Sequence, residues 1–309
     1  ELLIPRWDTM DLSRYPRNPG AKLPSMPIFT TRGCPFGCKF CIVTKMNGKS
    51  YRTKPIAHVL QELDQTRADD YFIVDDNIAC FPEYSRELFR SIRKRKITWM
   101  SQISTTVLNT PDLIDLAGKS GCYQLFVGVE SLSKASLKNM NKGFNQIEKY
   151  EELIARMKKA GISPFLSFIF GFDQDPVDQY EETLKFLRKN RVGHAAFWIL
   201  TPNPGTDIHQ EMENEGRIIE RRLSLYDGTN VVYKSLNASR EEIEKNFWKT
   251  YQSFYSFTGI MVNAFHNVMN SRRPLSELFR NLFIQGHFWR KVASFDHPFS
   301  GGFFKVSPP

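Results

Sequence analysis

The sequence has no long hydrophobic run, which argues against a chain that crosses a membrane as a helix. None of its apolar stretches approaches the ~20 residues that such a helix needs. Its start, from Glu1 to Pro5, lacks the charged, apolar and small-residue segments of a secretory signal peptide. It also lacks a start Met. We therefore expect part of a longer protein, located in the cytoplasm.

Cysteine is scarce and odd in number, which argues against a secreted disulfide framework. Only five cysteines occur, and Cys34, Cys38 and Cys41 fall within eight residues of one another. Thiols grouped in this way favour a reducing compartment and a metal site. Cys80 and Cys122 stand alone, and we interpret them, like the six scattered histidines, as structural or incidental.

Disorder and fibrous repeats are excluded by the composition. Hydrophobic residues make up 41% of the 309 residues and charged residues 24%, which is typical of a globular protein with a sizeable core. The length fits two domains or a single β/α barrel.

Charge of one sign is in excess. The 42 basic and 33 acidic residues give a net charge of +9, and such a surface can attract nucleic acid, anionic lipid or an acidic cofactor. Much of the excess lies in residues 86–96, where apolar residues recur at helical spacing. We interpret this run as a solvated helix face, with a polyanion site as the alternative.

Short apolar runs alternate with amphipathic segments as far as residue 201. Alternation of this kind predicts parallel strands joined by right-handed crossovers. Six such units fall short of the eight of a full barrel, so we predict an α/β fold with an open, partial (β/α)6 barrel. The predicted strands are residues 28–31, 71–74, 97–103, 123–130, 165–171 and 195–200, and the predicted helices include 55–63, 86–96, 147–160 and 176–188.

Polar residues follow several of these strands. In parallel β/α folds the carboxyl ends of the strands carry the site. The residues at or near such ends are Asp75, Asp76, Asn77, Ser101, Gln102, Glu130 and Ser131.

Beyond residues 202–206 the alternation stops. We predict helices at 211–222 and 239–257, joined by a turn at Asp227-Gly228 and a short strand at 230–233. Residues 247–304 are dense in aromatic side chains. These either pack helices onto the barrel or form an apolar wall or lid for a flat or lipidic substrate.

The strongest motif is Cys34-x3-Cys38-x2-Cys41, directly after the first predicted strand. Soft thiolates suit iron–sulfur clusters or zinc. Structural zinc requires a fourth ligand, usually from a second close pair, and the sequence has no such pair. Three cysteines on a four-iron cluster leave one iron open, which indicates chemistry at that iron and not electron transfer alone.

The segment from Thr31 to Cys41, with Phe40 before the last cysteine, resembles the radical S-adenosylmethionine (SAM) superfamily. The finer resemblance is to its cobalamin-dependent branch, which includes hopanoid and bacteriochlorophyll methylases and an oxidative cyclase of chlorophyll synthesis. Further matches to that branch are residues 52–55, 75–77, 128–131, 202–206 and 230–234, followed by a helix with Phe247, Trp248 and Tyr255.

This resemblance implies a domain organisation. Residues 27–206 form the partial barrel, and residues 207–309 form a mainly helical, aromatic-rich region. Residues 1–26 lead in from a cobalamin-binding domain that precedes this chain. Cobalamin is inferred from the resemblance alone.

The resemblance also implies the site. Cys34, Cys38 and Cys41 hold a 4Fe–4S cluster whose fourth iron binds SAM. One electron then releases methionine and a 5′-deoxyadenosyl radical, which removes a hydrogen atom from an unactivated carbon. The cofactor-binding residues are Phe40 against the adenine, Asp75, Asp76 and Asn77 at the methionine amino group, Glu130 at the ribose, and Ser167 and Trp198 at the adenosyl pocket. Gln102, at a strand end, is a further cofactor-binding candidate.

The expected reaction is methylation of an apolar or planar substrate, a lipid or a tetrapyrrole. The expected partners are this small molecule or lipid, a flavodoxin- or ferredoxin-type electron donor and a membrane surface, but not nucleic acid. Three alternatives stay open. They are a radical SAM enzyme without cobalamin that modifies RNA, oxidative cyclisation in place of methylation, and a non-enzymatic iron–sulfur or zinc module.

Overall fold

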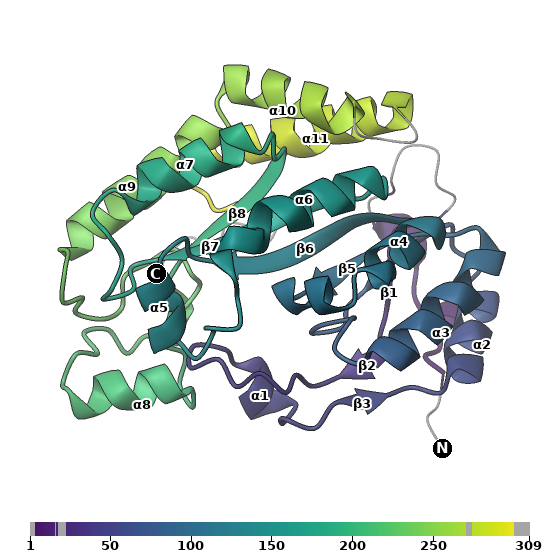
Figure 1. The fold of residues 1–309 in the computed structure, drawn as a ribbon, viewed down its shortest axis with the longest axis horizontal. Coiled ribbons are helices and arrows are strands. Elements are labelled where there is room, and N and C mark those ends of the chain that lie inside the picture. The colour runs from purple at the N-terminus through teal and green to yellow at the C-terminus, as the bar shows by residue number, and fades with distance from the viewer. Residues whose placement is uncertain (1–3, 16, 18–22, 270–273, 300–309) are drawn as a thin grey trace.

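A six-stranded parallel sheet forms the centre of the molecule (Figure 1). The computed structural model describes residues 4–15, 17, 23–269 and 274–299. The strand order is β1-β4-β5-β6-β7-β8, and all five neighbouring pairs are parallel. The sheet is open, with β1 and β8 at its edges, as the sequence predicted. The bounds are β1 Met26–Ile28, β4 Asp70–Ile73, β5 Thr98–Ile103, β6 Cys122–Glu130, β7 Ser163–Phe170 and β8 His194–Ile199.

Helices connect consecutive strands and bury one apolar side each against the sheet. Trp99 of β5, for example, stacks on Phe89 of a helix at a ring distance of 5.2 Å, and such burial of large apolar groups supplies most of the stability of the layer. The connecting helices are α2 Ile56–Thr66, α3 Pro82–Ile92, α4 Asp112–Lys119, α5 Lys134–Asn139, α6 Tyr150–Lys159 and α7 Gln179–Lys189. Single 3-10 turns lie at Trp7–Thr9, Leu12–Arg14, Arg93–Arg95, Thr105–Asn109, Ile147–Lys149 and Leu223–Leu225.

The first predicted strand, 28–31, is divided in the structure. Residues 26–28 form β1, whereas β2 (Thr31–Arg32) leaves the main sheet and pairs antiparallel with β3 (Arg52–Thr53). The buried carboxylate of Asp75 causes the break, because it accepts hydrogen bonds from the backbone N–H groups of Thr30 (2.7 Å) and Thr31 (3.0 Å). These groups are then not free to pair within the sheet. Between β2 and β3 lie the cysteine loop and the short helix α1 (Val43–Met46).

After β8 the chain differs from the sequence prediction in three places. The predicted helix 211–222 is wrong, because α8 spans Asp207–Asn214 and Gly216 adopts a left-handed conformation with φ +66°. The N–H of Arg217 then bonds back to Met212 (2.8 Å), which closes the helix end. The predicted strand 230–233 is reduced to a single bridge between Ile218 and Tyr233. The predicted helix 239–257 is α9 (Arg240–Phe254), followed by α10 (Phe257–Met269) and α11 (Pro274–Ala293).

The aromatic side chains of this region divide into two groups. One group packs against β8 and is buried: Phe247, Tyr251, Phe254, Tyr255 and Phe288. The other group is exposed: Phe257, Phe265, Phe283, Trp289 and Phe295. Packing of helices onto the sheet, the first of the two interpretations, therefore accounts for only part of the aromatic content. Of the helices in the described ranges, none has the length and apolar composition needed to cross a membrane.

Candidate active site at the carboxyl edge of the sheet

Two glycines shape the loop that carries the three cysteines. Gly33 and Gly37 have φ values of +94° and +44°, which side chains rarely adopt. A Cβ atom on Gly33 would lie 2.3 Å from the carbonyl oxygen of Ser50. The loop closes with a hydrogen bond from the N–H of Cys41 to the carbonyl of Cys38 (3.0 Å). These glycines allow the chain to return on itself within a few residues and to present its thiols together.

The thiols influence one another and lie in a poorly solvated place. Burial raises the pKa of Cys38 to about 12, and it also raises the pKa of Cys41. The electrostatic influence of the neighbouring cysteine thiols adds to both increases. Without a cation or a metal, this site therefore disfavours thiolates.

A fourth cysteine lies at the loop. A hydrogen bond from Cys80 lowers the pKa of Cys34 to about 7, and the Nδ2 of Asn77 lies 3.0 Å from the Cys80 sulfur. Cys80 therefore contacts the cysteine loop, and its interpretation as a structural or incidental cysteine stays a prediction. Cys80 comes three residues after Asn77, in the segment that follows β4. Its closeness in sequence to a predicted site residue was the signal that could have identified it. Cys122 is buried at the start of β6, as expected of a structural cysteine.

The donor set at the loop suits a cluster better than a single ion. Within the described ranges, no three His, Cys, Asp or Glu side chains converge closely enough to hold one metal ion. A four-iron cluster is a larger body whose ligands bind separate irons, so its cysteines need not converge on one point. Three thiols without a carboxylate or imidazole among them are the donors that iron–sulfur clusters take. The residues present fit such a group.

Asp75 is buried beneath the loop and holds it in place. Its carboxylate accepts hydrogen bonds from the backbone of Thr30 and Thr31 and from the hydroxyl of Thr30. Burial raises the pKa of Asp75, and these bonds oppose the increase. The contacts give Asp75 a positioning role, and its predicted contact with SAM stays a prediction.

Asp76 and Asn77 continue this support. Asp76 accepts the N–H of Gly33 (3.0 Å) and the amide of Asn47 (3.1 Å), so it braces the cysteine loop from below. The side-chain oxygen of Asn77 accepts the N–H of Ser104 (3.2 Å), which joins the ends of β4 and β5. Asp76 is only partly buried, and its role at the SAM amino group stays a prediction.

Glu130 forms a buried ion pair that the sequence did not reveal. Its carboxylate lies 2.5 Å from the Nζ of Lys142, and each side chain is 9% exposed. Glu130 has φ +67° at the end of β6, and its carboxylate folds back over Gly128. A Cβ atom on Gly128 would lie 2.5 Å from that carboxylate and 2.9 Å from the Lys142 nitrogen. Gly128 therefore makes room for the pair.

Lys142 connects this pair to the cysteines. Burial by itself lowers its pKa, but Glu130 and the thiols of Cys38 and Cys41 outweigh burial and raise it. The Nζ also lies 5.7 Å from the ring centre of Phe40. Lys142 thus remains an ammonium group between a carboxylate and the thiols. The sequence alone gave no periodicity or spacing that would single out this lysine.

The remaining predicted residues share one face of the sheet. Gly128 pairs with Ser167, and Ile169 pairs with Trp198 across parallel strands. Paired residues in a parallel sheet point to the same side, and alternation places Gln102 with them. In the part of the chain that the structure describes, the Gln102 amide forms no hydrogen bond, although it is half-buried. Such an amide is suited to a ligand.

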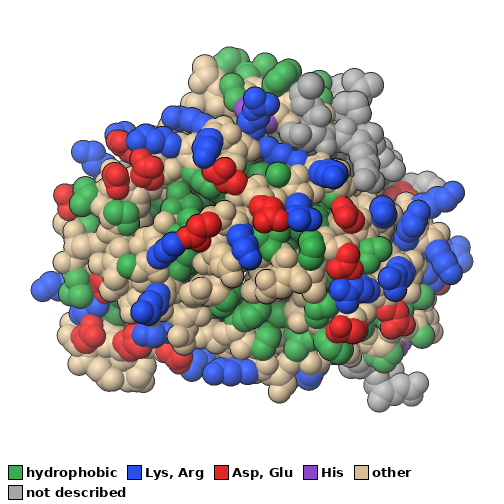
Figure 2. All heavy atoms as spheres, in the orientation of Figure 1, with side chains coloured by type: hydrophobic (Ala, Val, Ile, Leu, Met, Phe, Trp, Pro, Cys, Tyr) green, Lys and Arg blue, Asp and Glu red, His purple; other side chains and the backbone are tan. Residues whose placement is uncertain are grey.

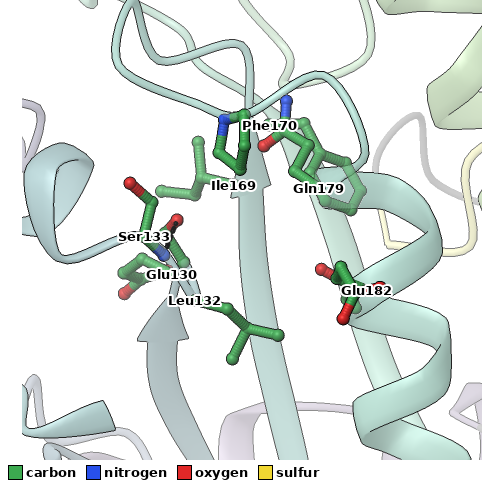
Figure 3. A pocket seen from close by; sticks show the side chains of 10 residues that line it. Glu130, Leu132, Ser133, Ile169, Phe170, Gln179 and Glu182 are labelled. Carbon is green, nitrogen blue, oxygen red and sulfur yellow. Dashed lines mark hydrogen bonds between the residues drawn. The ribbon is translucent and has the colours of Figure 1, made fainter.

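A small cavity lies beside Glu130 at the ends of β6 and β7. Its volume is about 180 Å³. Figure 3 shows Glu130 and Ser133 on one side of it, and Gln179 and Glu182 of α7 on the other. Ile169 lies between the two groups. Glu130 therefore forms an ion pair with the Lys142 ammonium and also lines this cavity.

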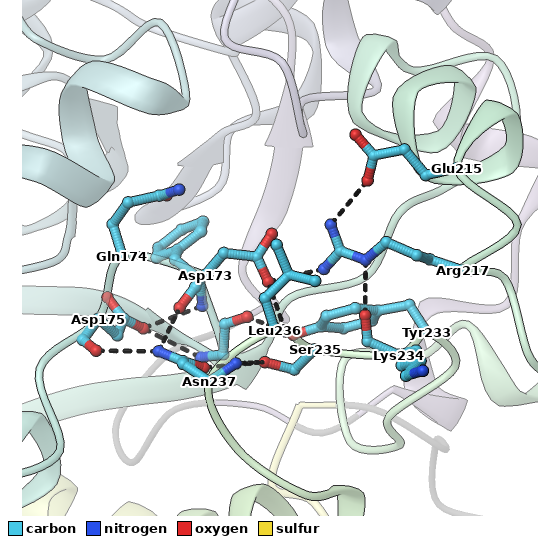
Figure 4. Close-up of polar contacts among 12 residues, drawn as sticks. Asp173, Gln174, Asp175, Glu215, Arg217, Tyr233, Lys234, Ser235, Leu236 and Asn237 are labelled. Carbon is cyan, nitrogen blue, oxygen red and sulfur yellow. Dashed lines mark hydrogen bonds and ion pairs between the residues drawn. The ribbon is translucent and has the colours of Figure 1, made fainter.

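A polar network braces the loop after β7 (Figure 4). Arg217 pairs with Asp173 (2.6 Å) and Glu215 (3.0 Å), and it donates to the carbonyl of Lys234 (2.7 Å). Asp173 also accepts the N–H of Leu236 (3.0 Å). The network ties the region after β8 to the carboxyl edge of the sheet.

Asp175 closes the same loop from within. It accepts the N–H groups of Gly171 (3.1 Å) and Phe172 (3.0 Å) and the hydroxyl of Ser136 (2.7 Å). Burial nevertheless raises the pKa of Asp175 to about 6. This carboxylate stabilises the loop through hydrogen bonds at the cost of its own desolvation.

Comparisons with known proteins agree with this architecture. The family model of the radical SAM superfamily matches residues 28–187. The chain is 33% identical over 290 residues to bacteriochlorophyllide d C-12(1)-methyltransferase of Chlorobaculum tepidum, covering 91% of this chain and 62% of that protein. It is 27% identical over 284 residues to the C-8(2)-methyltransferase of the same organism, covering 88% and 62%.

A solved structure of TsrM, a radical SAM methyltransferase from Kitasatospora setae with cobalamin and a 4Fe–4S cluster bound, has the same fold. Its TM-score is 0.58 at 20% identity, over 72% of this chain and 43% of that one. The chain thus spans less than two thirds of each of these three proteins. Members of the matched family bind a 4Fe–4S cluster and SAM. On the match over residues 28–187 and the cysteine loop within it, the chain belongs to the radical SAM superfamily.

Proposed function

We propose that the protein is a cobalamin-dependent radical SAM methyltransferase that acts on a planar tetrapyrrole. One observation carries the site: the buried Glu130–Lys142 pair lies at the carboxyl edge of the sheet, close enough to Cys38 and Cys41 for their thiols to help raise the pKa of Lys142. A buried, charged lysine beside three cysteines serves no purpose in packing alone, because burying an ion pair generally costs more than an apolar replacement. It fits a site that receives a charged ligand.

The chain's own residues account for both ends of SAM. Lys142 offers an ammonium group to the methionine carboxylate, and Asp76 and Glu130 offer carboxylates to its amino group or to the ribose hydroxyls. When bound, the cluster supplies the electron that cleaves SAM to a 5′-deoxyadenosyl radical.

The inner face of the sheet suits the adenosyl group. Gln102 offers a half-buried amide that makes no hydrogen bond within the described ranges, and Trp198 offers a half-buried aromatic surface on the same face. Phe40, next to Cys41 and beneath the Lys142 ammonium, offers a second ring. Together these groups exclude water from a reactive radical.

The substrate class rests on the relatives. Two matched methyltransferases act, by their names, on bacteriochlorophyllide d, and the match covers 91% and 88% of this chain. The regions of those proteins outside the match leave room for a cobalamin-binding domain. We therefore assign cobalamin to a region of the whole protein outside these 309 residues, as the methyl donor.

The test is anaerobic and uses the reconstituted protein with dithionite, SAM, methylcobalamin and a chlorophyllide-type tetrapyrrole. We expect 5′-deoxyadenosine and a product heavier by one CH₂ in mass spectrometry. Cys38→Ala should abolish both products and the cluster absorbance, whereas the matched variant Cys122→Ala, at the opposite edge of the sheet, should retain them.

Three other results would contradict the proposal. A product lighter by two hydrogens for each ring bond formed, with no carbon added, would indicate oxidative cyclisation. Methylation of RNA without cobalamin would indicate the alternative without that cofactor. One zinc per chain with no visible absorbance would indicate a metal-binding module.

A further inference from the structure

The end of the molecule formed by α10 and α11 exposes an apolar surface. We call it the apolar end and define it by Phe257, Met261, Val262 and Phe265 of α10, with Leu282, Phe283 and Trp289 of α11. Phe257 is 70% exposed, Phe265 62% and Phe283 74%. Figure 2 shows hydrophobic side chains gathered over α10. Contiguous exposed surface of this kind marks an interaction site.

The pattern of α10 is unusual for a surface helix. Its 13 residues include no Lys, Arg, Asp or Glu. Phe257, Met261 and Phe265 recur every four residues and so lie along one exposed face, while Ile260 and Ala264 on the adjoining side of the helix are buried. A helix that faces water normally carries charged residues at such outward positions. The outward face of α10 is therefore suited to an apolar environment.

A cavity lined by two arginines adjoins the apolar end. We call it the basic cavity; its volume is about 320 Å³. It lies between the end of α7 and the start of α10, and Val262 of the apolar end forms part of its wall. Arg188, Arg191 and His266 line it together with hydroxyl side chains, and no carboxylate does. Ser256 caps α10 at this point by accepting the N–H of Gly259 (3.1 Å), so the positive end of the helix dipole also faces the cavity.

Among the described residues, Arg188 and Arg191 of the basic cavity have no acidic partner. Lys158 donates to the carbonyls of Asn190 (2.6 Å) and Arg191 (3.0 Å), and Arg188 donates to the hydroxyl of Ser253 (3.0 Å). In the part of the chain that the structure describes, neither these two arginines nor the neighbouring Lys158 forms an ion pair. Burial and the charge of Arg191 lower the pKa of Lys158 to about 8, which agrees with uncompensated positive charge.

An apolar surface beside arginines without ion-pair partners limits which kind of partner can bind at this end of the protein. A second copy docked by a twofold axis would bring its own cations against these, and like charges repel. Single-stranded nucleic acid could stack on aromatic rings such as Phe257 and Phe265, but it offers no apolar phase for Met261, Val262 and Leu282. An anionic bilayer satisfies both parts, because apolar side chains enter its interfacial region and phosphates attract the cations.

We propose that this end of the protein docks on a bilayer that contains anionic phospholipid, with the apolar end in the interfacial region and a lipid phosphate in the basic cavity. The surface lies far from the cysteine loop, since α10 and α11 occupy the opposite end of the molecule from α1 and α8 (Figure 1). Docking therefore does not use the catalytic residues. The proposal does not depend on the reaction that the protein catalyses.

The experiment is anaerobic flotation of the cluster-loaded protein with lipid vesicles. We expect binding to vesicles of phosphatidylcholine with about a third phosphatidylglycerol, weak binding to phosphatidylcholine alone, and loss of binding as salt increases. The double variant Arg188→Gln/Arg191→Gln should lower the partition coefficient about thirty-fold, roughly fivefold for each charge. The variant Phe257→Ser/Phe265→Ser should lower it by about a hundredfold.

Matched controls distinguish binding at this surface from non-specific binding elsewhere on the protein. Arg93→Gln/Lys94→Gln removes the same charge from the exposed basic run after α3 and should leave binding unchanged. Val177→Ser removes an apolar group that is 97% exposed elsewhere and should also leave binding unchanged. All four altered positions of the test variants are exposed, so an unchanged unfolding temperature confirms that the variants fold.

Several outcomes would overturn the proposal. These are equal binding to neutral and anionic vesicles, binding that survives both test variants, and binding lost equally in Arg93→Gln/Lys94→Gln. A dimer in light scattering that Phe257→Ser/Phe265→Ser dissociates would assign the surface to a second copy. Retention of RNA with loss in Arg188→Gln/Arg191→Gln, without vesicle binding, would assign it to nucleic acid.

Discussion

The two ends of the parallel sheet differ in whether their charged side chains are buried in ion pairs or exposed without them. At the carboxyl edge, Glu130 and Lys142 are 9% exposed and lie 2.5 Å apart. At the other end, Arg188 and Arg191 are exposed, line a cavity without carboxylates and adjoin the apolar face of α10. The same fold thus holds a buried, paired charge at one end and unpaired cations at the other.

This difference indicates the kind of ligand to which each end is suited. A buried pair is costly to assemble and is suited to a small ligand that enters the protein and is fixed there. Exposed cations beside aromatic side chains cost little and are suited to a partner that stays outside the protein. Substitutions at the two ends should therefore differ in their effect on stability.

The largest effect is expected from Lys142→Met. It leaves Glu130 buried without its partner, which should cost about 3–5 kcal/mol of unfolding free energy and weaken SAM binding at least tenfold. Adding Glu130→Gln should restore most of the stability but not the affinity. Anaerobic urea unfolding and SAM titration measure both. A double variant that regains SAM affinity would contradict the role of Lys142.

Arg217→Met should have the next largest effect, and on stability alone. It breaks the ion pair with Asp173 and the bond to the carbonyl of Lys234, at a cost of about 2–3 kcal/mol. We expect the affinity for SAM, titrated at a temperature well below the unfolding midpoint, to stay within about twofold of the parent because no direct SAM contact is removed. A selective loss of SAM affinity would place the network in the binding site.

A smaller effect concerns Asp175 and pH. Its pKa in the folded protein is about 6 and lies above the ordinary carboxyl value of about 3.9. The folded state therefore takes up the proton first, and this contribution to stability is fully present below pH ~4 and lost as the pH rises through 6. From pH 7.5 to pH 5, the parent should gain about 1 kcal/mol relative to Asp175→Asn. Unfolding midpoints of both proteins at the two pH values measure the gain, and parallel shifts would contradict it.

The smallest effect is expected at the other end. Arg188→Gln and Arg191→Gln remove exposed, unpaired cations, so each should change the unfolding free energy by less than about 0.5 kcal/mol. Thermal unfolding checks this. A loss as large as that of Lys142→Met would show that these cations have structural partners and would remove the contrast between the two ends.

Much of the fold could be predicted from the sequence. Six apolar strands alternate with amphipathic helices, and each strand lies within three residues of its predicted position. The errors lie where a tertiary contact overrides local pattern. Asp75 draws Thr30 and Thr31 away from the first strand, and a pairing partner at Tyr233 takes the chain after Gly216. Neither contact is visible in the local sequence, because each joins residues far apart along the chain.

The site could be predicted in part. Their spacing alone predicts that Cys34, Cys38 and Cys41 act as ligands together, because three ligands on one loop occupy only a short segment of the sequence. Lys142 and Cys80 carry no such signal. Lys142 reaches Glu130 only because the loop after α5 folds over the end of β6, and Cys80 reaches Cys34 only because β4 lies beside β1.

The sequence by itself determined the alternation of strands and helices, the cysteine loop and the family to which they belong. These depend on periodicity and short-range spacing, which the order of residues contains directly. Only the tertiary structure decided which charges are buried in pairs and which stay unpaired on the surface, and which aromatic side chains face water. Those properties depend on the distance between segments that are remote in sequence, and that distance is set when the helices pack onto the sheet.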